Sequence, residues 1–562
     1  MMKLLQSSVK AKYLLILIFP LFYFFAGLYF RLILEAPSLR SIDPDYVYFM
    51  TGLNISEGFL KVIHIDHPGT PLQYLIALIF RSTWLFRDNP DGYIADVLSH
   101  SDLYLSIVNI SITTIIAISL HVAGKYVLNK TRSVLDALLV QTIPLIPVIL
   151  YEIIGRIVPE LLLPLPIIGL TVFFIGRISN NKKQYQRNDL ILLSFFVAVG
   201  ISIKLTLIPI WIIPIIIVKG LKKKLTTIVM SFVFFLIIAL PVTLNLEKFW
   251  NWTKALFIHS GQYGTGQENV INIAQFIENL KQIASLQPHF TILVIGTLLT
   301  IIILEILRRT KRQGRVNNKI ILATAILLCI FAQTIISGKH YAPRYFMPAL
   351  MFTPLLLFLF IEILKDYIPA KIFKPAKVIV LSVFLVWTLL QQFKTIEFTS
   401  SAFEKQLAAR VKTKNYASTF EDESIKVIVS QDYGSPFTEY ALQFSIIWSA
   451  HQLKANYTKI LARMYPTTYQ YTTWDGQFRY WGEPFNSKMI IDNNIPVYIY
   501  LEKNTKDLYN KTIDKLRETG SNFNAEKKLL FENPVNGECL LQLFISNPGE
   551  SNPNITKSST IE

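Results

Sequence analysis

Residues 13–29 read YLLILIFPLFYFFAGLY, an unbroken apolar run that decides the class of this protein. Lys3, Lys10 and Lys12 precede it, which would suit a signal peptide, but no small-residue cleavage site follows and further apolar runs do. We therefore expect a retained first membrane helix. Of the 562 residues, 52% are hydrophobic and only 17% are charged, so the chain is predicted to be a polytopic α-helical membrane protein.

The remaining apolar runs predict the number of spans. A helix needs about 20 apolar residues to cross a bilayer, and by this measure there are about eleven spans. They cover 13–30, 103–123, 134–152, 159–176, 190–203, 205–218, 225–243, 289–307, 319–337, 345–364 and 377–392.

Charge sets the expected orientation. The formal net charge is +17, but Lys and Arg cluster in every other loop, as the positive-inside rule requires, so binding of nucleic acid is not expected. This pattern places the N-terminus in the cytoplasm of an inner or plasma membrane, with the loop after the first span and the C-terminal tail outside. The two cysteines, Cys329 and Cys539, indicate no disulfide framework.

The chain is predicted to have three parts. Residues 1–392 form the membrane domain, with a large first external loop over 31–102. Residues 393–550 form a small extracytoplasmic α/β domain with strands at 425–432, 495–502 and 539–546 and helices at 435–450 and 506–518. Residues 551–562, rich in Ser, Asn and Pro, are predicted to be disordered.

The first external loop opens with SIDPDYVYFMTGL, residues 41–53. Asp43 before Pro44 would serve as an N-cap, and Asp45 would interact with the dipole of a helix that runs toward Gly52. The alternative is that both carboxylates converge on a cation, on a phosphate-bound metal or on a hydroxyl to be deprotonated. Both interpretations are compatible, because a capped helix end is also rigid.

The same loop continues with IDHPGTPL, residues 65–72. Pro68 favours extended backbone at His67, and Thr70 with Gln73 forms the pattern of a capping box. An amphipathic helix over 71–87 is predicted to follow along the membrane interface. Asp66 and His67 would then lie in a turn at the membrane surface.

Further polar residues interrupt the apolar runs. Glu160 follows Val158 and Pro159, where it suits either a helix N-terminus or a second acidic site residue. Lys204 interrupts a double span, which indicates a functional site unless its stem reaches the interface. The stretch SGKHYAPRYFMP, residues 337–348, places positive side chains at an outer edge, against the orientation rule: Lys339, His340 and Arg344.

The motifs DPDYVYFMTGL and IDHPGTPL resemble the GT-C glycosyltransferases, which include protein O-mannosyltransferases and the aminoarabinose transferases of lipid A. The resemblance implies a GT-C-like fold and a sugar donor carried on polyprenyl phosphate in the bilayer. It implies transfer to a hydroxyl of a glycan, lipid or protein acceptor, with inversion. IDHPGTPL departs from these relatives at Gly69, where a second proline is frequent, so the subfamily stays open.

The resemblance assigns roles to the polar residues. Asp43 or Asp45 would be the general base. Donor phosphate would be held by Lys204, Arg344, Lys339 and His340. Contacts to sugar or acceptor are expected from Asp66, His67, Glu160 and, in the loop FIHSGQYGTGQE at 257–268, from His259, Gln262 and Tyr263. The resemblance fixes no cofactor, and a divalent metal, Mg or Mn, on Asp43, Asp45 and Glu160 is left open.

Two other functions fit the membrane topology. A transporter or flippase of lipid-linked sugars would need no general base, and such proteins often show repeated halves, which this sequence lacks. A glycan polymerase or ligase would use a diphosphate-linked glycan.

Overall fold

The computed structural model describes residues 9–33, 36–40, 42–87, 90–182, 184–259, 268, 271–310, 317–421, 423–430, 434–473, 475–481, 485–491, 495–520 and 523–546. The chain forms two compact units, each assembled from segments that are distant in sequence. The membrane unit comprises residues 1–32, 58–77 and 107–399, and the loop–tail unit comprises residues 33–57, 78–106 and 400–562.

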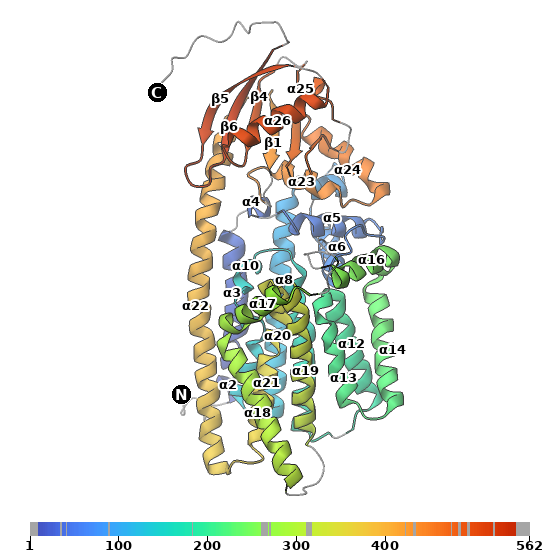
Figure 1. Cartoon of the computed structure of the whole chain (residues 1–562), viewed down its shortest axis with the longest axis vertical. Coiled ribbons are helices and arrows are strands. Elements are labelled where there is room, and N and C mark those ends of the chain that lie inside the picture. The colour runs from blue at the N-terminus through green and yellow to red at the C-terminus, as the bar shows by residue number, and fades with distance from the viewer. Residues whose placement is uncertain are drawn as a thin grey trace. The chain divides into compact units, whose positions relative to one another are not determined.

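Among the described residues, the membrane unit is built from helices, with short loops and one isolated β-bridge between them. Its helices are α2 (Val9–Leu15), α3 (Ile18–Ile33), α6 (Thr70–Trp84), α8 (Ser101–Thr131), α9 (Val134–Gln141), η1 (Ile143–Leu145), α10 (Leu150–Ile153), η2 (Pro159–Leu162), α11 (Pro164–Ser179), α12 (Arg187–Ile203), η3 (Leu205–Trp211), α13 (Ile212–Ile217), α14 (Leu221–Ile238), α15 (Leu240–Thr243), α16 (Leu246–Ile258), α17 (Ile273–Leu286), α18 (Pro288–Thr310), α19 (Asn318–Lys339), α20 (Pro343–Met351), α21 (Thr353–Leu364) and α22 (Ala370–Ala417). Helix α12 packs along α14, and α19 contacts η3, α13, α17, α20 and α21 (Figure 1).

Seven stretches of the described residues are long and apolar enough to cross a membrane: 10–33, 101–131, 159–179, 288–310, 318–339, 343–364 and 370–417. The predicted class, a polytopic helical membrane protein, is confirmed. The other four predicted spans fold as shorter or interrupted helices. Prolines explain two of them, because Pro144 and Pro147 lie in the segment 134–152, and Pro209 and Pro214 lie in 205–218.

Helix α22 continues far beyond its apolar part, through residues rich in helix formers to Ala417 (Figure 1). The predicted domain boundary at 392/393 lies inside this helix. The three-part division of the chain stays a prediction, and its last part, 551–562, lies outside the described residues.

The loop–tail unit contains the predicted sheet. Six strands, β1 (Ile425–Ser430), β2 (Thr468–Thr472), β3 (Gln477–Arg479), β4 (Val497–Leu501), β5 (Asn524–Glu532) and β6 (Cys539–Ser546), pair in the order β3-β2-β1-β4-β6-β5. The neighbours β2, β1 and β4 are parallel, and the remaining pairs are antiparallel. Helices α23 (Thr438–Ile446), α24 (His451–Met464), α25 (Lys488–Ile491) and α26 (Lys506–Glu518) connect them.

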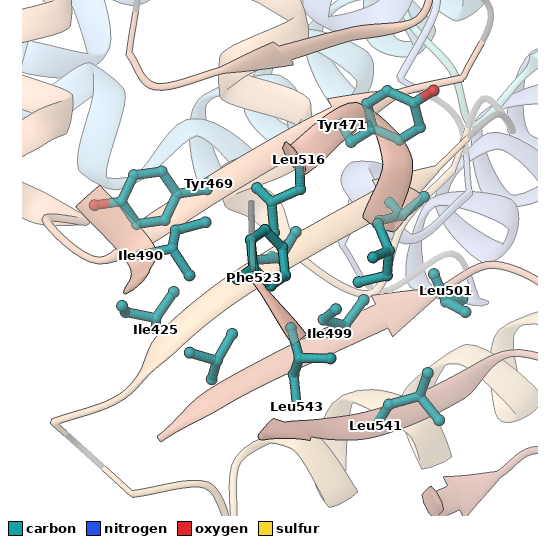
Figure 2. Packing of buried hydrophobic residues seen from close by; sticks show 14 of the residues in the cluster. Ile425, Tyr469, Tyr471, Ile490, Ile499, Leu501, Leu516, Phe523, Leu541 and Leu543 are labelled. Carbon is teal, nitrogen blue, oxygen red and sulfur yellow. The ribbon is translucent and has the colours of Figure 1, made fainter. Parts of the chain in front are cut away.

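The sheet is held by a hydrophobic cluster of side chains from β1, β2, β4, β6 and α26. Figure 2 shows Ile425, Ile499, Leu516, Phe523 and Leu541 pointing into this cluster. Its aromatic members stack on one another, with 4.7 Å between the ring centroids of Tyr471 and Phe478. Tyr469, Tyr471 and Phe478 therefore pack in the core of the sheet.

The same unit also contains the start of the first external loop. It includes α4 (Pro37–Arg40), α5 (Asp45–Ser56) and α7 (Tyr93–Ser99). The Asn54 side chain donates a hydrogen bond to the Trp448 carbonyl at 3.0 Å, and the Ser435 backbone N–H donates to the Ser38 carbonyl at 3.2 Å. The loop and the tail thus fold together.

We predict that Ile499→Ala destabilises the loop–tail unit by about 2–5 kcal/mol, because the side chain is fully buried on a central strand and its loss leaves a cavity. Thermal unfolding of the purified protein in detergent, with protection of residues 400–546 from proteolysis, measures the effect. Leu529→Ala, on the edge strand β5 with 49% of its surface exposed, is the control and should cost under about 0.5 kcal/mol. Equal effects of both substitutions would contradict this description of the core.

Candidate active site

A buried ion pair lies at the centre of the membrane unit. Lys204 is 1% exposed and Glu160 is 4% exposed, and the Lys204 ammonium donates a hydrogen bond to the Glu160 carboxylate. Both residues lie where a helix breaks: Lys204 has extended backbone between α12 and η3, and Glu160 follows Pro159 at the start of η2. The Lys204 ammonium is therefore enclosed in protein and paired with a carboxylate.

An aromatic ring joins this pair to a second cation. The Lys204 ammonium lies 4.7 Å from the ring centroid of Tyr345, and the Arg344 guanidinium carbon lies 5.3 Å from it. Arg344 and Tyr345 are in the first turn of α20, directly after Pro343. Cations over an aromatic face gain electrostatic stabilisation, more so away from water. The predicted phosphate ligands Lys204 and Arg344 are thus brought together on one tyrosine.

His67 also packs against this tyrosine. The ring centroids of His67 and Tyr345 are 5.7 Å apart, and those of His67 and Trp252 are 5.4 Å apart. The prediction of extended backbone at His67 is wrong, because its φ is +57°, in the left-handed region that few residues adopt. The packed aromatic neighbours fix a backbone that the local preference before Pro68 does not favour.

The pKa of His67 is held well below its usual value, because burial strips water from the ring and the positive charges of Lys204 and Arg344 lie close by. Burial raises the pKa of the neighbouring Asp66, and the Lys248 charge partly offsets this. Lys248 also donates a hydrogen bond to the Ile63 carbonyl at 3.1 Å. Helix α16 thereby holds the segment that leads to Asp66 and His67.

The start of α6 differs from the prediction. The Thr70 hydroxyl donates to the Ser202 carbonyl at 3.4 Å, at the end of α12. The Gln73 amide nitrogen donates to the carbonyls of His64 and Pro68 at 3.4 Å each, while its oxygen makes no hydrogen bond within the described structure. The predicted capping box is therefore absent, and these side chains instead tie the turn to the site. The predicted interfacial helix is present as Thr70–Trp84.

A mostly apolar cavity of about 280 Å³ opens beside the aromatic residues. Its lining comes from η3, α16, α19 and the start of α20, and it includes His67, Lys339, His340 and Tyr345. The Lys339 ammonium donates to the carbonyls of Leu256 and Phe257 at 2.7 Å each. The buried Nε2 atom of His340 has no hydrogen-bond partner among the described residues. Burial and the charge of Lys339 lower the pKa of His340.

The acidic pair belongs to the loop–tail unit. Asp43 is exposed, whereas Asp45 is 2% exposed and is the first residue of α5. The predicted N-cap is wrong, since Pro44 occupies the cap position and no side chain caps this helix. Asp45 does lie in the first turn, near the positive end of the helix dipole, as predicted.

The external loop over 257–268 is described only in part. His259 ends α16 and pairs with Glu268 through an isolated β-bridge. Gln262 and Tyr263 lie outside the described residues, so their predicted sugar contacts stay predictions.

The described side chains do not fit a metal centre. Across the described ranges, no group of three or more His, Cys, Asp or Glu residues is placed to hold an ion. Glu160, one of the three proposed ligands, is bound by Lys204.

Several site residues were not predicted. Tyr345 and Trp252 carry no charge, so a search for ionisable groups in apolar runs does not find them. Lys248 was also missed, because it lies in a polar loop helix where lysine is ordinary. The position of Tyr345 directly after Arg344 was the available signal.

No protein-family model matches this chain, and no curated protein sequence matches it. Among the similar solved structures are ArnT from Cupriavidus metallidurans bound to undecaprenyl phosphate, at 11% identity and a TM-score of 0.46, and the same protein in the apo state, at 12% identity and a TM-score of 0.49. Each match covers 93% of this chain and 97% of the other. The roles of residues rest on this chain's own geometry.

The buried pair yields a stability prediction. Lys204→Met leaves the Glu160 carboxylate buried without its cation and should cost about 3–5 kcal/mol, whereas the double variant Lys204→Met with Glu160→Gln should recover most of this loss. Thermal unfolding in detergent measures both variants. Arg308→Met, which breaks a half-exposed pair with Glu305 on α18, is the control and should change stability little. A double variant no more stable than the single one would contradict the pairing.

His67 predicts a pH dependence. Its pKa is lowered in the folded protein, so the unfolded chain binds more protons as the pH falls below the usual value of 6.5, and stability is lost there. The unfolding temperature should therefore fall between about pH 7.5 and about pH 5.5, and part of this fall should be missing in His67→Asn. Asparagine tolerates the left-handed backbone. His100→Asn, at an exposed histidine, should leave the profile unchanged.

Proposed function

We propose that this protein is a membrane glycosyltransferase that moves a sugar from a polyprenyl-phosphate donor to an acceptor hydroxyl on the extracytoplasmic face. The observation that carries the proposal is the buried pair of Lys204 and Glu160, with Lys204 and Arg344 both near the ring of Tyr345, next to an apolar cavity in the membrane unit. Buried ionisable groups in a membrane protein are costly and point to function. The basic loops support an N-terminus in the cytoplasm.

The charge of the site favours a phosphate-linked donor. Lys204, Arg344 and Lys339 are cations and Glu160 is an anion, so these side chains suit a negatively charged group. A monophosphate link between sugar and polyprenol is what the resemblance to GT-C glycosyltransferases implies.

The cavity accounts for the lipid part of the donor. Its walls are mainly aliphatic, which suits the first isoprenoid units, and Lys339 and His340 lie on its polar side. The Nε2 atom of His340 is available to a phosphate oxygen, since it has no hydrogen-bond partner among the described residues. We retain both residues as phosphate ligands, with Asp66, His67, Glu160, His259, Gln262 and Tyr263 as contacts to sugar or acceptor.

In the proposed step, the acceptor oxygen attacks the anomeric carbon, and the bond from that carbon to the phosphate oxygen breaks. The electron pair of this bond leaves with the polyprenyl phosphate, whose added charge Lys204 and Arg344 stabilise. The acceptor proton passes to a carboxylate, for which we propose Asp43 or Asp45. A single displacement inverts the anomeric centre.

Transfer assays test this function directly. Purified protein should consume one member of a panel of polyprenyl-phosphate sugars and label an acceptor. Asp43→Asn or Asp45→Asn should slow transfer about 10²–10⁴-fold while donor binding persists, because only the base is lost. Arg344→Ala should weaken donor binding and slow transfer, whereas Arg309→Ala, on an exposed helix end, should do neither.

The outcomes separate the alternatives. Movement of the intact donor across vesicles without transfer, unaffected by either Asn variant, would indicate a flippase. Consumption of diphosphate-linked glycans alone would indicate a polymerase or ligase. Normal donor affinity in Arg344→Ala would remove the phosphate-binding role of this arginine.

A further inference from the structure

The main chain just before the acidic pair is held by a side chain from the distant helix α22. Within the loop–tail unit, the Arg410 guanidinium donates to the carbonyl of Leu39 at 2.5 Å and to the carbonyl of Arg40 at 3.3 Å. These carbonyls end the short helix α4, where backbone acceptors lack partners within the helix. Asp43 lies three residues after Arg40, so Arg410 fixes the main chain just before the acidic pair.

Arg410 is itself held in place by a buried acid. Its Nε atom lies 3.4 Å from Glu538, which is 3% exposed. The Glu538 carboxylate also accepts hydrogen bonds from the hydroxyls of Thr413 at 2.6 Å and Tyr500 at 3.1 Å. Because the Glu538 carboxylate has three partners, it restricts the position of the Arg410 side chain. The guanidinium is therefore bound by a carboxylate that is itself held by α22 and β4.

The approach of these segments is close enough to require glycine at one position. A Cβ atom added to Gly434 would lie 2.0 Å from Arg410 Nη1 and 2.6 Å from the Arg40 carbonyl oxygen. Real Cβ atoms do not come this near, so the bend after β1 leaves room for the contact between Arg410 and the loop.

Asp102 is a second anchor, and it binds residues on both sides of the acidic pair. Asp102 accepts hydrogen bonds from the Ser38 hydroxyl at 3.2 Å and from the Tyr46 hydroxyl at 2.8 Å. Thr438 on α23 donates to the same carboxylate at 3.4 Å. Asp43 and Asp45 therefore lie on a short segment whose two ends are fixed to the body of the loop–tail unit.

We propose that Arg410, oriented by Glu538, is a positioning residue that sets the geometry of the segment carrying Asp43 and Asp45. Arg410 acts through the loop backbone and does not touch the reacting atoms. The proposal rests on the proposed function, in which one of these carboxylates takes the acceptor proton. Its role is to keep that carboxylate in a productive position.

Hydrogen–deuterium exchange of the full-length protein tests the first half of the proposal without any transfer reaction. In Arg410→Ala, the backbone amides of residues 38–46 should exchange about tenfold faster than in the wild type, and Arg410→Lys should restore part of the protection. The matched control is Arg517→Ala. Arg517 also donates to a backbone carbonyl, that of Phe523 at 3.2 Å, and lies 3.3 Å from Asp514, but it is remote in sequence from the loop. Unchanged exchange at residues 38–46 in Arg410→Ala would overturn the proposal.

Kinetics test the second half. Arg410→Ala should lower kcat about 10–100-fold, while KM for the donor stays within about twofold, because misplacement of a base affects the reaction step more than donor binding. Arg410→Ala combined with the slow variant, Asp43→Asn or Asp45→Asn, should cause little further loss. Arg410→Lys serves if the alanine variant does not fold, and should show the same change in smaller size.

The outcomes distinguish this proposal from the function it rests on. A wild-type protein that transfers no sugar overturns the proposed function, whatever the exchange data show about Arg410. A wild-type protein that transfers, with Arg410→Ala at unchanged kcat, overturns the positioning role alone.

Discussion

The buried Lys204–Glu160 pair is the constraint on which the membrane unit depends. Two ions can be removed from water only if each satisfies the other, so the helix breaks that carry them must remain in register. Pro159 opens one break and Pro209 lies in the turn after the other, and both stiffen the backbone at these points. The same lysine lies over Tyr345, so the pair also places α20 and, through it, Arg344.

A single tyrosine then links the ionic and the aromatic parts of the site. Tyr345 lies close to both cations and to His67, and it also lines the cavity. Charge, aromatic surface and apolar volume therefore meet within a few residues. Each of these suits a different part of a phospholipid-like donor: the phosphate, the sugar and the chain.

The sequence was informative wherever an ionisable group interrupts an apolar run, because burial of charge is rare enough to notice. It identified Lys204, Glu160 and Arg344 in this way, but not the pairing of Lys204 with Glu160, since the partners are 44 residues apart. It also failed at His67, where packing between Trp252 and Tyr345 overrides the local preference before a proline. Strands β1, β4 and β6 were found from their apolar runs, whereas the charged edge strand β5, NAEKKLLFE, gave no such signal.

The joint fold of the first external loop and the tail has a consequence for how this protein is made. Arg410 and Leu39 are 371 positions apart, so the early segment leaves the ribosome long before its partners exist. Until the last strands have been synthesised and have paired, residues 36–57 lack their native neighbours and are accessible to chaperones and proteases. Premature termination anywhere before β6 would thus yield a chain that is inserted in the bilayer but has an unformed acidic segment. For the same reason, a chimaera that takes its tail from another such protein should also take the first loop from that protein.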